Sequence, residues 1–205
     1  TVLSRGLGDV YKRQVEILNV KTKVASFPWH EMPKDGGWSF GTNIDYMKNL
    51  ADYWTKEYDW KSQEVRLNQF PNYKTKVDDL DIHFIIKKSS SPKAIPLILI
   101  HGWPGSIVEF LEIIDPLCEP EKYGNDNEVC FDIIAPSIPG FAFSGKPENP
   151  IGPRRIAGIF NKLMTEKLGY KKYVAQGGDW GSAISTWLGF DLSLIHISEP
   201  TRQDR

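Results

Sequence analysis

The chain contains 205 residues, with 25 basic and 26 acidic side chains, and its formal net charge at pH 7 is −1. Hydrophobic residues make up 40% and charged residues 25%, which is ordinary for a globular protein and excludes a disordered or collagen-like chain. The balanced charge excludes a large basic surface for nucleic acid. The length corresponds to one domain, or to one domain with an appendage.

Neither a cofactor nor a membrane span is implied by the sequence. Two cysteines, Cys118 and Cys130, are too few for a disulfide framework and lack metal-ligand spacing. No Gly-rich phosphate-binding loop is present, so no cofactor or metal is expected. The longest apolar runs have about six residues, whereas a span needs roughly 20, and no signal-peptide pattern opens the chain. These features predict a soluble, cytoplasmic-type chain with reduced thiols.

The two ends differ in pattern from the rest of the chain. Residues 1–14 are basic and contain glycine, without helical or strand periodicity, and the pattern changes again at residue 192. Both 1–14 and 192–205 resemble translated sequencing-adapter read-through, and we interpret them as non-native segments. A genuine strand is the alternative for the second, but the preceding helix runs to about Phe190 and leaves little room for a connection.

Residues 15–78 predict a mostly helical N-terminal segment. Apolar residues three or four apart over 43–60 predict one amphipathic helix. Residues 67–77 contain a proline and show little periodicity, so we expect an irregular connection there. Alternating apolar and polar residues over 80–87 then predict a half-buried strand, which begins the next domain.

From residue 95 onward, the chain predicts alternating strands and helices. The continuous apolar run 95–100 is typical of a strand covered on both faces, residues 131–135 predict a second buried strand, and 173–176 is a third short strand. A helical stripe follows each strand. This order predicts an α/β fold with a parallel sheet and right-handed crossovers, and we assign residues 79–191 to it.

The most specific motif is Gly177-Gly178-Asp179-Trp180-Gly181, between a predicted strand and a predicted helix. A nucleophile elbow needs small residues two positions before and two positions after the nucleophile. Gly177 and Gly181 meet this requirement, with Asp179 in the nucleophile position. The alternative is an ordinary strand-to-helix turn in which Asp179 caps the helix, because Asp favours that position.

A second motif, HGWPGS at residues 101–106, follows the first buried strand. In an α/β-hydrolase sheet, the loop at this place supplies one backbone N–H of the oxyanion hole, and the residue after the nucleophile supplies the other. Here these donors are the amides of Trp103 and Trp180. The motif histidine precedes the nucleophile, whereas the base of this fold comes last in the chain. We therefore expect structural or substrate-binding roles for the other motif residues: His101, Gly102, Pro104, Gly177, Gly178 and Gly181.

These motifs resemble the epoxide hydrolases of the α/β-hydrolase superfamily, and closest the microsomal type, which includes juvenile hormone epoxide hydrolases. The similarity runs through residues 15–191 and includes WSFGTN (38–43), YDW (58–60), LNQFPNYKTKVDDLDIHFI (67–85), HGWPGS (101–106), PSIPGFAFS (136–144) and QGGDWGS (176–182). One departure is Asp79, where the family usually has Gly in a turn. The resemblance implies an α/β-hydrolase fold preceded by the helical epoxide hydrolase N-terminal domain.

The resemblance also implies a hydrolase that converts lipophilic epoxides to vicinal diols through an ester on Asp179. The implied partners are a small lipophilic epoxide and water, and Asp179 is ionised at neutral pH and needs no prior deprotonation. Trp38, Trp103, Phe141 and Phe143 are candidates to line an apolar pocket or to lie in the core. Membrane contact is expected only through an N-terminal anchor missing from this sequence, at the endoplasmic reticulum for an animal microsomal-type protein.

In the resembled family, the acid, the base histidine and two proton-donating tyrosines come well after the nucleophile. We therefore expect this chain to be an N-terminal fragment that does not turn over and forms the ester at most slowly. Two alternatives stay open. A haloalkane dehalogenase shares the Asp–Trp pair but typically has Asn where this chain has Trp103. The other alternative is a non-catalytic α/β-hydrolase-like binding protein.

Overall fold

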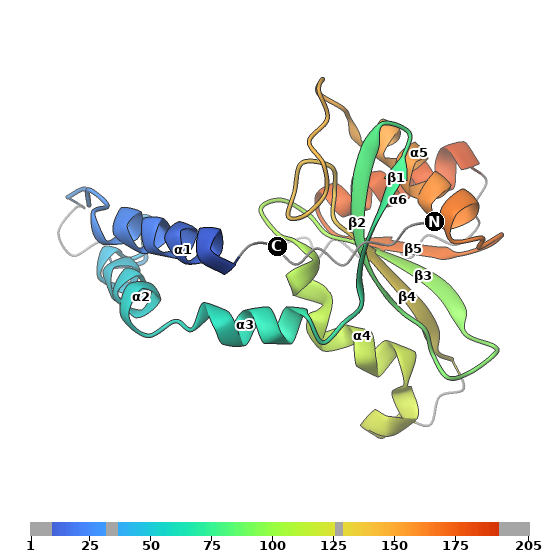
Figure 1. Ribbon diagram of the computed structural model, residues 1–205, viewed down its shortest axis with the longest axis horizontal. Helices are drawn as coiled ribbons and strands as arrows, with labels where there is room; N and C mark the ends of the chain where they lie inside the picture. The colour runs from blue at the N-terminus through green and yellow to red at the C-terminus, as the bar shows by residue number, and fades with distance from the viewer. Residues whose placement is uncertain (1–9, 32–36, 126–128, 193–205) are drawn as a thin grey trace. The chain divides into compact units, whose positions relative to one another are not determined.

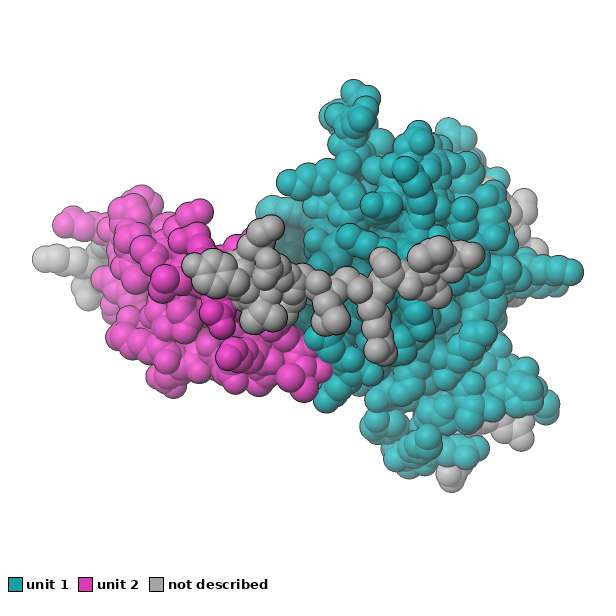
Figure 2. All heavy atoms as spheres, in the orientation of Figure 1, with its two compact units in different colours: residues 1–5, 66–205 teal, residues 6–65 magenta. Residues whose placement is uncertain are grey.

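The computed structural model describes residues 10–31, 37–125 and 129–192, which divide into two compact units (Figure 2). Unit 2 lies within residues 6–65, and the described part of unit 1 begins at Arg66. Residues 1–9 and 193–205 of the adapter-like ends lie outside the described residues, and their origin stays a prediction. Residues 10–14 belong to helix α1 (Val10–Ala25), although their sequence shows no helical periodicity.

Unit 2 is helical, as predicted, but the helix expected over 43–60 ends at Lys56, and a second helix begins at Trp60. The helices are α1, α2 (Ile44–Lys56) and the first part of α3 (Trp60–Leu67). Asn43 caps α2 by accepting a hydrogen bond from the amide of Tyr46 at 2.9 Å. Asp59 accepts one from the amide of Lys61 at 2.9 Å, which favours a new helix start at this position. The second cap therefore explains why the helical pattern is interrupted.

Unit 1 contains a five-stranded mixed sheet (Figure 1). Its strands are β1 (Asn72–Val77), β2 (Leu80–Lys87), β3 (Ile95–Ile100), β4 (Phe131–Pro136) and β5 (Val174–Gly177). The order across the sheet is β1-β2-β4-β3-β5, and β3 pairs in parallel with both β4 and β5. The predicted parallel sheet is thus confirmed for these three strands. The antiparallel strands β2 and β1 extend it on one side.

Strand β1 replaces the irregular connection expected over residues 67–77. It pairs with β2 from Asn72 opposite Ile85 to Val77 opposite Leu80. Thr75 and Val77 are buried while Lys74 and Lys76, which alternate with them, are exposed, as expected for a strand with one covered face. Because β1 belongs to the sheet, the compact units divide at residues 65 and 66, whereas the sequence predicted a boundary at residues 78 and 79.

Ion pairs link the tip of the β1–β2 hairpin to helix α5 (Pro153–Lys162). Asp78 has a φ of 51°, in the left-handed region, and forms ion pairs with Arg155 at 2.7 Å and Lys162 at 2.6 Å. The hydrogen bond from Lys162, together with the charge of both cations, lowers the pKa of Asp78. Asp79, where the family usually has Gly, does not adopt a positive φ. The change from Gly is therefore compatible with this turn.

Helices cover both faces of the sheet, which explains the continuous apolar run of β3 and the apolar residues 133–135 of β4. Ile98 and Ile100 face a cluster built with α5 and α6 (Trp180–Leu192). Leu97 and Leu99 face the other cluster, built with α4 (Leu111–Cys118) and the 3₁₀ turn before it (Ile107–Phe110). A second 3₁₀ turn (Pro120–Tyr123) follows α4, and a π turn (Leu163–Lys167) ends α5. No helix within the described ranges has both the length and the apolar character needed to cross a membrane.

A buried polar network joins β1, β2 and the loop after β4. His83 is 4% exposed. Its Nδ1 lies 2.9 Å from the Ser137 hydroxyl oxygen, and its Nε2 lies 2.9 Å from the side-chain carbonyl oxygen of Asn72. Asn72 donates its amide hydrogens to two backbone carbonyls, so its oxygen must accept from His83. Nε2 therefore carries a proton, and in the neutral ring Nδ1 accepts from the Ser137 hydroxyl. Burial, followed by the charge of Lys74, lowers the pKa of His83 to about 4.

We expect His83 to make the stability of the chain fall in mild acid. Its pKa is 6.5 in the unfolded chain and about 4 in the folded one, so the unfolded chain binds the proton more readily. The contribution of His83 is complete above pH 6.5 and is lost as the pH falls toward 4, by on the order of 3 kcal/mol. Urea unfolding at several pH values, on the wild type and on His83→Gln, measures this. Equal pH slopes for the two chains contradict the assignment.

Candidate active site

Asp179 lies at the turn between β5 and α6, at the carboxyl end of the parallel strands. Its φ is 53°, a left-handed conformation that Asp tolerates better than most residues. A capping Asp has an extended backbone, and its side chain accepts from the second or third amide of the helix. Asp179 instead accepts from the amide of the next residue and from a separate loop. The geometry therefore differs from a capped turn and matches a nucleophile elbow.

The glycines two positions before and after Asp179 are required by close backbone contacts. A Cβ at Gly181 would lie 2.8 Å from the carbonyl carbon of Ile100 and 2.9 Å from the carbonyl oxygen of His101. A Cβ at Gly177 would lie 2.8 Å from the Cα of Gly181. Gly178 is different, because no atom lies within 4 Å of the place where its Cβ would be. A side chain at position 181 would therefore prevent the turn from packing against β3, and one at position 177 would prevent the turn from closing on Gly181.

One oxygen of the Asp179 carboxylate is held by two backbone amides. Trp103 donates to Oδ2 at 3.0 Å and Trp180 at 2.5 Å. These are the two amides predicted for the oxyanion hole. Oδ1 has no hydrogen-bond partner within the described part of the chain. The carboxylate therefore presents one restrained oxygen and one oxygen available for reaction.

The electrostatics of the site favour the ionised carboxylate. The hydrogen bond from the Trp103 amide, followed by that from Trp180, lowers the pKa of Asp179 below its ordinary value. The side chain is exposed, so burial opposes this only weakly. Asp179 is therefore ionised throughout the neutral range and can act as a nucleophile without a base.

The loop that carries Trp103 is held by contacts that the sequence did not indicate. His101 is 1% exposed, and its Nδ1 lies 3.0 Å from the carbonyl oxygen of Gly102. Its Nε2 accepts the amide of Ile138, from the loop after β4, at 3.0 Å. Glu109 accepts the amide of Gly102 at 3.4 Å. Glu109 lies outside the motifs, and Ile138, although it lies within PSIPGFAFS, takes part through its backbone amide, so only the fold reveals these two contacts.

Pro104 and the candidate aromatic residues differ in their exposure and contacts. Pro104 is exposed and follows Trp103 through a cis peptide bond. Phe141 is half-buried, and its ring lies edge-on to His101 with 5.6 Å between centroids. Trp103 and Phe143 are 65% and 51% exposed, so they do not belong to the core. Trp38 belongs to unit 2 and is also exposed.

Comparisons with known proteins agree with this geometry. Residues 9–110 match the family described as epoxide hydrolase N terminus, and residues 95–189 match the α/β hydrolase fold family. Juvenile hormone epoxide hydrolase 1 of Ctenocephalides felis is 41% identical over 173 residues, which cover 82% of this chain and 36% of that protein. Epoxide hydrolase 1 of Sus scrofa is 39% identical over 176 residues, or 83% of this chain and 38% of that protein.

A solved structure supports the same assignment. The crystal structure of juvenile hormone epoxide hydrolase from Bombyx mori has a TM-score of 0.81 and 32% identity, and the match covers 96% of this chain and 46% of that one. The chain belongs to the epoxide hydrolase family. It spans less than half the length of these relatives. The matches do not favour a haloalkane dehalogenase or a non-catalytic binding protein.

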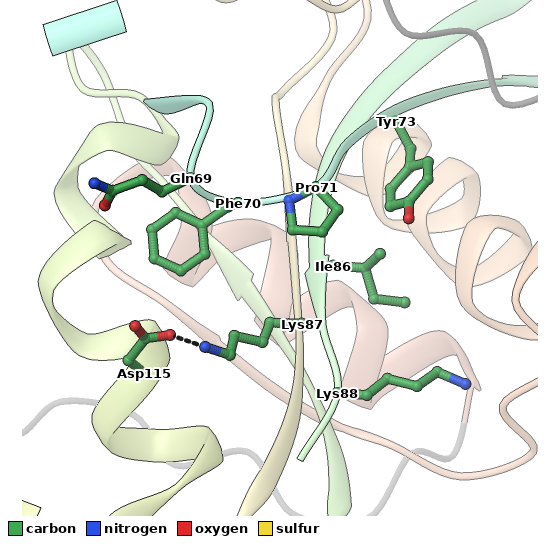
Figure 3. Close-up of a pocket in the computed structure, with 8 residues that line it drawn as sticks. All are labelled: Gln69, Phe70, Pro71, Tyr73, Ile86, Lys87, Lys88 and Asp115. Carbon is green, nitrogen blue, oxygen red and sulfur yellow. Dashed lines mark hydrogen bonds and ion pairs between the residues drawn. The ribbon is translucent and has the colours of Figure 1, made fainter. Parts of the chain in front are cut away.

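A pocket of about 380 Å³ lies elsewhere in this epoxide hydrolase fold (Figure 3). Its lining residues are Gln69, Phe70, Pro71, Tyr73, Ile86, Lys87, Lys88 and Asp115. Lys87 at the end of β2 forms an ion pair with Asp115 of α4 there. Because β2 is antiparallel to β4, this end of β2 lies toward the edge where the parallel strands begin. Asp179 follows the opposite edge, where ligands of open α/β sheets usually bind.

A metal site was not predicted from the sequence. Over the described residues, no three or more His, Cys, Asp or Glu side chains are grouped so that they could hold a metal ion. Both cysteines are free and buried, and burial raises the pKa of Cys118 to about 11. The Cys118 thiol is therefore protonated at neutral pH and is a poor nucleophile. Asp179 is the candidate that the geometry of the site favours.

Proposed function

We propose that Asp179 is the nucleophile of a hydrolase that opens small lipophilic epoxides to vicinal diols. The observation that carries this proposal is the asymmetric carboxylate: Trp103 and Trp180 hold Oδ2, while Oδ1 is available. A carboxylate is ionised at neutral pH and suits displacement at a saturated carbon. The family to which the chain belongs, and the names of its relatives, support an epoxide as the substrate class.

In the proposed first step, Oδ1 of Asp179 attacks a carbon of the epoxide ring. A bond forms between Oδ1 and that carbon, the bond from the carbon to the ring oxygen breaks, and the ring oxygen takes a proton to become a hydroxyl group. The product is an ester on Asp179 in which Oδ2 is the carbonyl oxygen. Because two amides already fix Oδ2, the carboxylate needs little rearrangement to reach this state.

In the proposed second step, water attacks the carbonyl carbon of the ester. Negative charge then develops on Oδ2, where the amides of Trp103 and Trp180 stabilise it, as in other oxyanion holes. Collapse of this intermediate restores the carboxylate and releases the second hydroxyl group of the diol. Water must lose a proton in this step, so a general base is required.

We further propose that the 205-residue chain stops at the ester. Both nitrogens of His83 and both nitrogens of His101 are already hydrogen bonded. Burial lowers the pKa of each ring. These two histidines are therefore occupied by structural contacts and cannot accept the proton of the attacking water. The ester is expected to persist and to be open to isolation.

Intact-protein mass spectrometry after incubation with styrene oxide tests this proposal. We expect a mass increase equal to one styrene oxide, because ring opening releases no leaving group. Peptide mapping should place the adduct on Asp179, and hydroxylamine should remove it, since it cleaves esters. Asp179→Asn should lose the adduct because a carboxamide is a poor nucleophile.

Several outcomes would contradict the proposal. An adduct of equal yield in Asp179→Asn means that another side chain reacts. Release of bromide from a bromoalkane at a rate exceeding that of epoxide labelling favours a dehalogenase. Production of the diol from styrene oxide at a steady rate means that the chain contains a working base, and it overturns the statement that the reaction stops at the ester.

A further inference from the structure

The peptide group between Gly102 and Trp103 has a bonding partner at each end. Its N–H, on Trp103, donates to Asp179 Oδ2 at 3.0 Å. Its carbonyl oxygen, on Gly102, lies 3.0 Å from Nδ1 of His101. A trans peptide group is planar, and its C=O and N–H point in opposite directions. A contact that holds the carbonyl therefore also sets the direction of the N–H.

The second ring nitrogen of His101 determines which nitrogen carries the proton. Nε2 lies 3.0 Å from the backbone nitrogen of Ile138, which can only donate. Nε2 must therefore be the acceptor, and in the neutral ring the proton is on Nδ1, directed at the Gly102 carbonyl. Burial lowers the pKa of His101, and this effect exceeds the opposing effects of the Gly102 hydrogen bond and the Glu109 charge. The lowered pKa favours the neutral ring. The edge-on contact with Phe141 further restricts the ring.

We propose that His101 is a positioning residue that aims the Trp103 amide at Asp179 through the Gly102 carbonyl. This inference rests on the proposed function, because the aim of the amide matters for catalysis only if Asp179 is the nucleophile. Hydrogen bonding at the carbonyl polarises the peptide group and strengthens its N–H as a donor. His101 does not touch the reacting atoms in this arrangement, and it acts entirely through the backbone.

Two substitutions test the hydrogen bonds of the two His101 ring nitrogens separately. The side-chain amide of Asn has the same number of bonds from Cβ as Nδ1, so His101→Asn keeps a donor for the Gly102 carbonyl and loses the contact with Ile138. The amide of Gln reaches the place of Nε2, so His101→Gln keeps an acceptor for Ile138 and loses the donor. The proposal requires Gln to disturb the Trp103 amide more than Asn does.

The test is NMR spectroscopy of the ¹⁵N-labelled 205-residue chain at pH 7, following the Trp103 amide. In His101→Gln we expect its proton resonance to move upfield and its hydrogen exchange to become about fivefold to tenfold faster, the ratio that corresponds to one hydrogen bond of about 1 kcal/mol. In His101→Asn we expect a clearly smaller change. His83→Gln is the matched control, because His83 is also buried and hydrogen bonded but contacts Ser137 and Asn72.

An unchanged Trp103 amide in His101→Gln, or a change no larger than in the control, overturns the proposal. If the variants do not fold, the wild type still provides a test, because ¹⁵N shifts of the His101 ring report its tautomer. A proton on Nδ1 supports the proposal, and a proton on Nε2 overturns it. No substrate is used in these measurements. Failure of the epoxide to label Asp179 would therefore be a separate result, which bears on the proposed function alone.

Discussion

Replacing Gly181 with alanine is expected to destabilise unit 1 by about 3 kcal/mol or more. The added Cβ would lie 2.8 Å from the carbonyl carbon of Ile100, nearer still to its oxygen, and 2.9 Å from the carbonyl oxygen of His101. These are backbone atoms at the end of β3, the strand that pairs with both β4 and β5. Overpacking typically costs 1–3 kcal/mol, and the largest costs arise where the neighbours cannot move.

Gly178→Ala is the matched control for this prediction. The same methyl group is added three residues earlier in the same turn, where nothing lies within 4 Å and φ is not positive. We expect the free energy of unfolding to change by no more than about 0.5 kcal/mol. Urea unfolding of the three chains measures both values. Similar losses in Gly178→Ala and Gly181→Ala would mean that the turn tolerates no side chain for a reason other than contact with β3.

The sequence motif predicted the strand, turn and helix around Asp179, but it did not indicate which of the three glycines must lack a side chain. The elbow rule concerns the positions two residues before and after the nucleophile, which are Gly177 and Gly181, and both have close backbone contacts. Gly178 was grouped with them as a site residue, yet the space around it is open. Local sequence indicates that a turn is tight, whereas the neighbouring strand determines which of its residues must be small.

The buried strands were predictable for a physical reason that β1 lacks. Residues 95–100 and 133–135 are apolar throughout because helices cover both faces of the sheet, and this burial is visible in the sequence as continuous runs. In β1 the covered face consists of Tyr73, Thr75 and Val77, of which only Val77 is aliphatic. Its strand conformation depends on pairing with β2, a contact that the local pattern does not encode.

The two amides proposed for the oxyanion hole could be predicted from two motifs, whereas the contacts that hold them could not. Trp103 and Trp180 follow from the order of the elements along the chain. The contact of His101 with Ile138 joins residues that are 37 positions apart, and it uses a backbone amide, which every residue except proline possesses. Without a particular residue type at position 138, the sequence contains no sign of this contact. The pairing of Asn72 with His83 is also invisible in the local sequence, because it joins side chains on two different strands.

Replacing Gly102 with alanine is expected to slow ester formation on Asp179 by about 100-fold, with a loss of stability smaller than that of Gly181→Ala. The added Cβ would lie 2.6 Å from Cβ of Asp179 and 2.8 Å from its Oδ2. The carboxylate of Asp179 is exposed and can turn away from the new methyl group, whereas its Cβ can move only if the turn itself shifts. Turning away separates Oδ2 from the Trp103 amide, and a displacement of about 1 Å in an active site can cost about 100-fold in rate.

The rate of styrene oxide labelling, measured by intact-protein mass spectrometry alongside urea unfolding, tests this prediction. Gly181→Ala should lose labelling only in proportion to its unfolded fraction, because its added methyl group contacts β3. Gly102→Ala should label more slowly than its unfolded fraction accounts for, because its methyl group contacts the nucleophile. If Gly102→Ala labels at the wild-type rate, the Trp103 amide does not hold the carboxylate for reaction. In that case Trp180 alone restrains Oδ2, and the loop that carries Trp103 has another role.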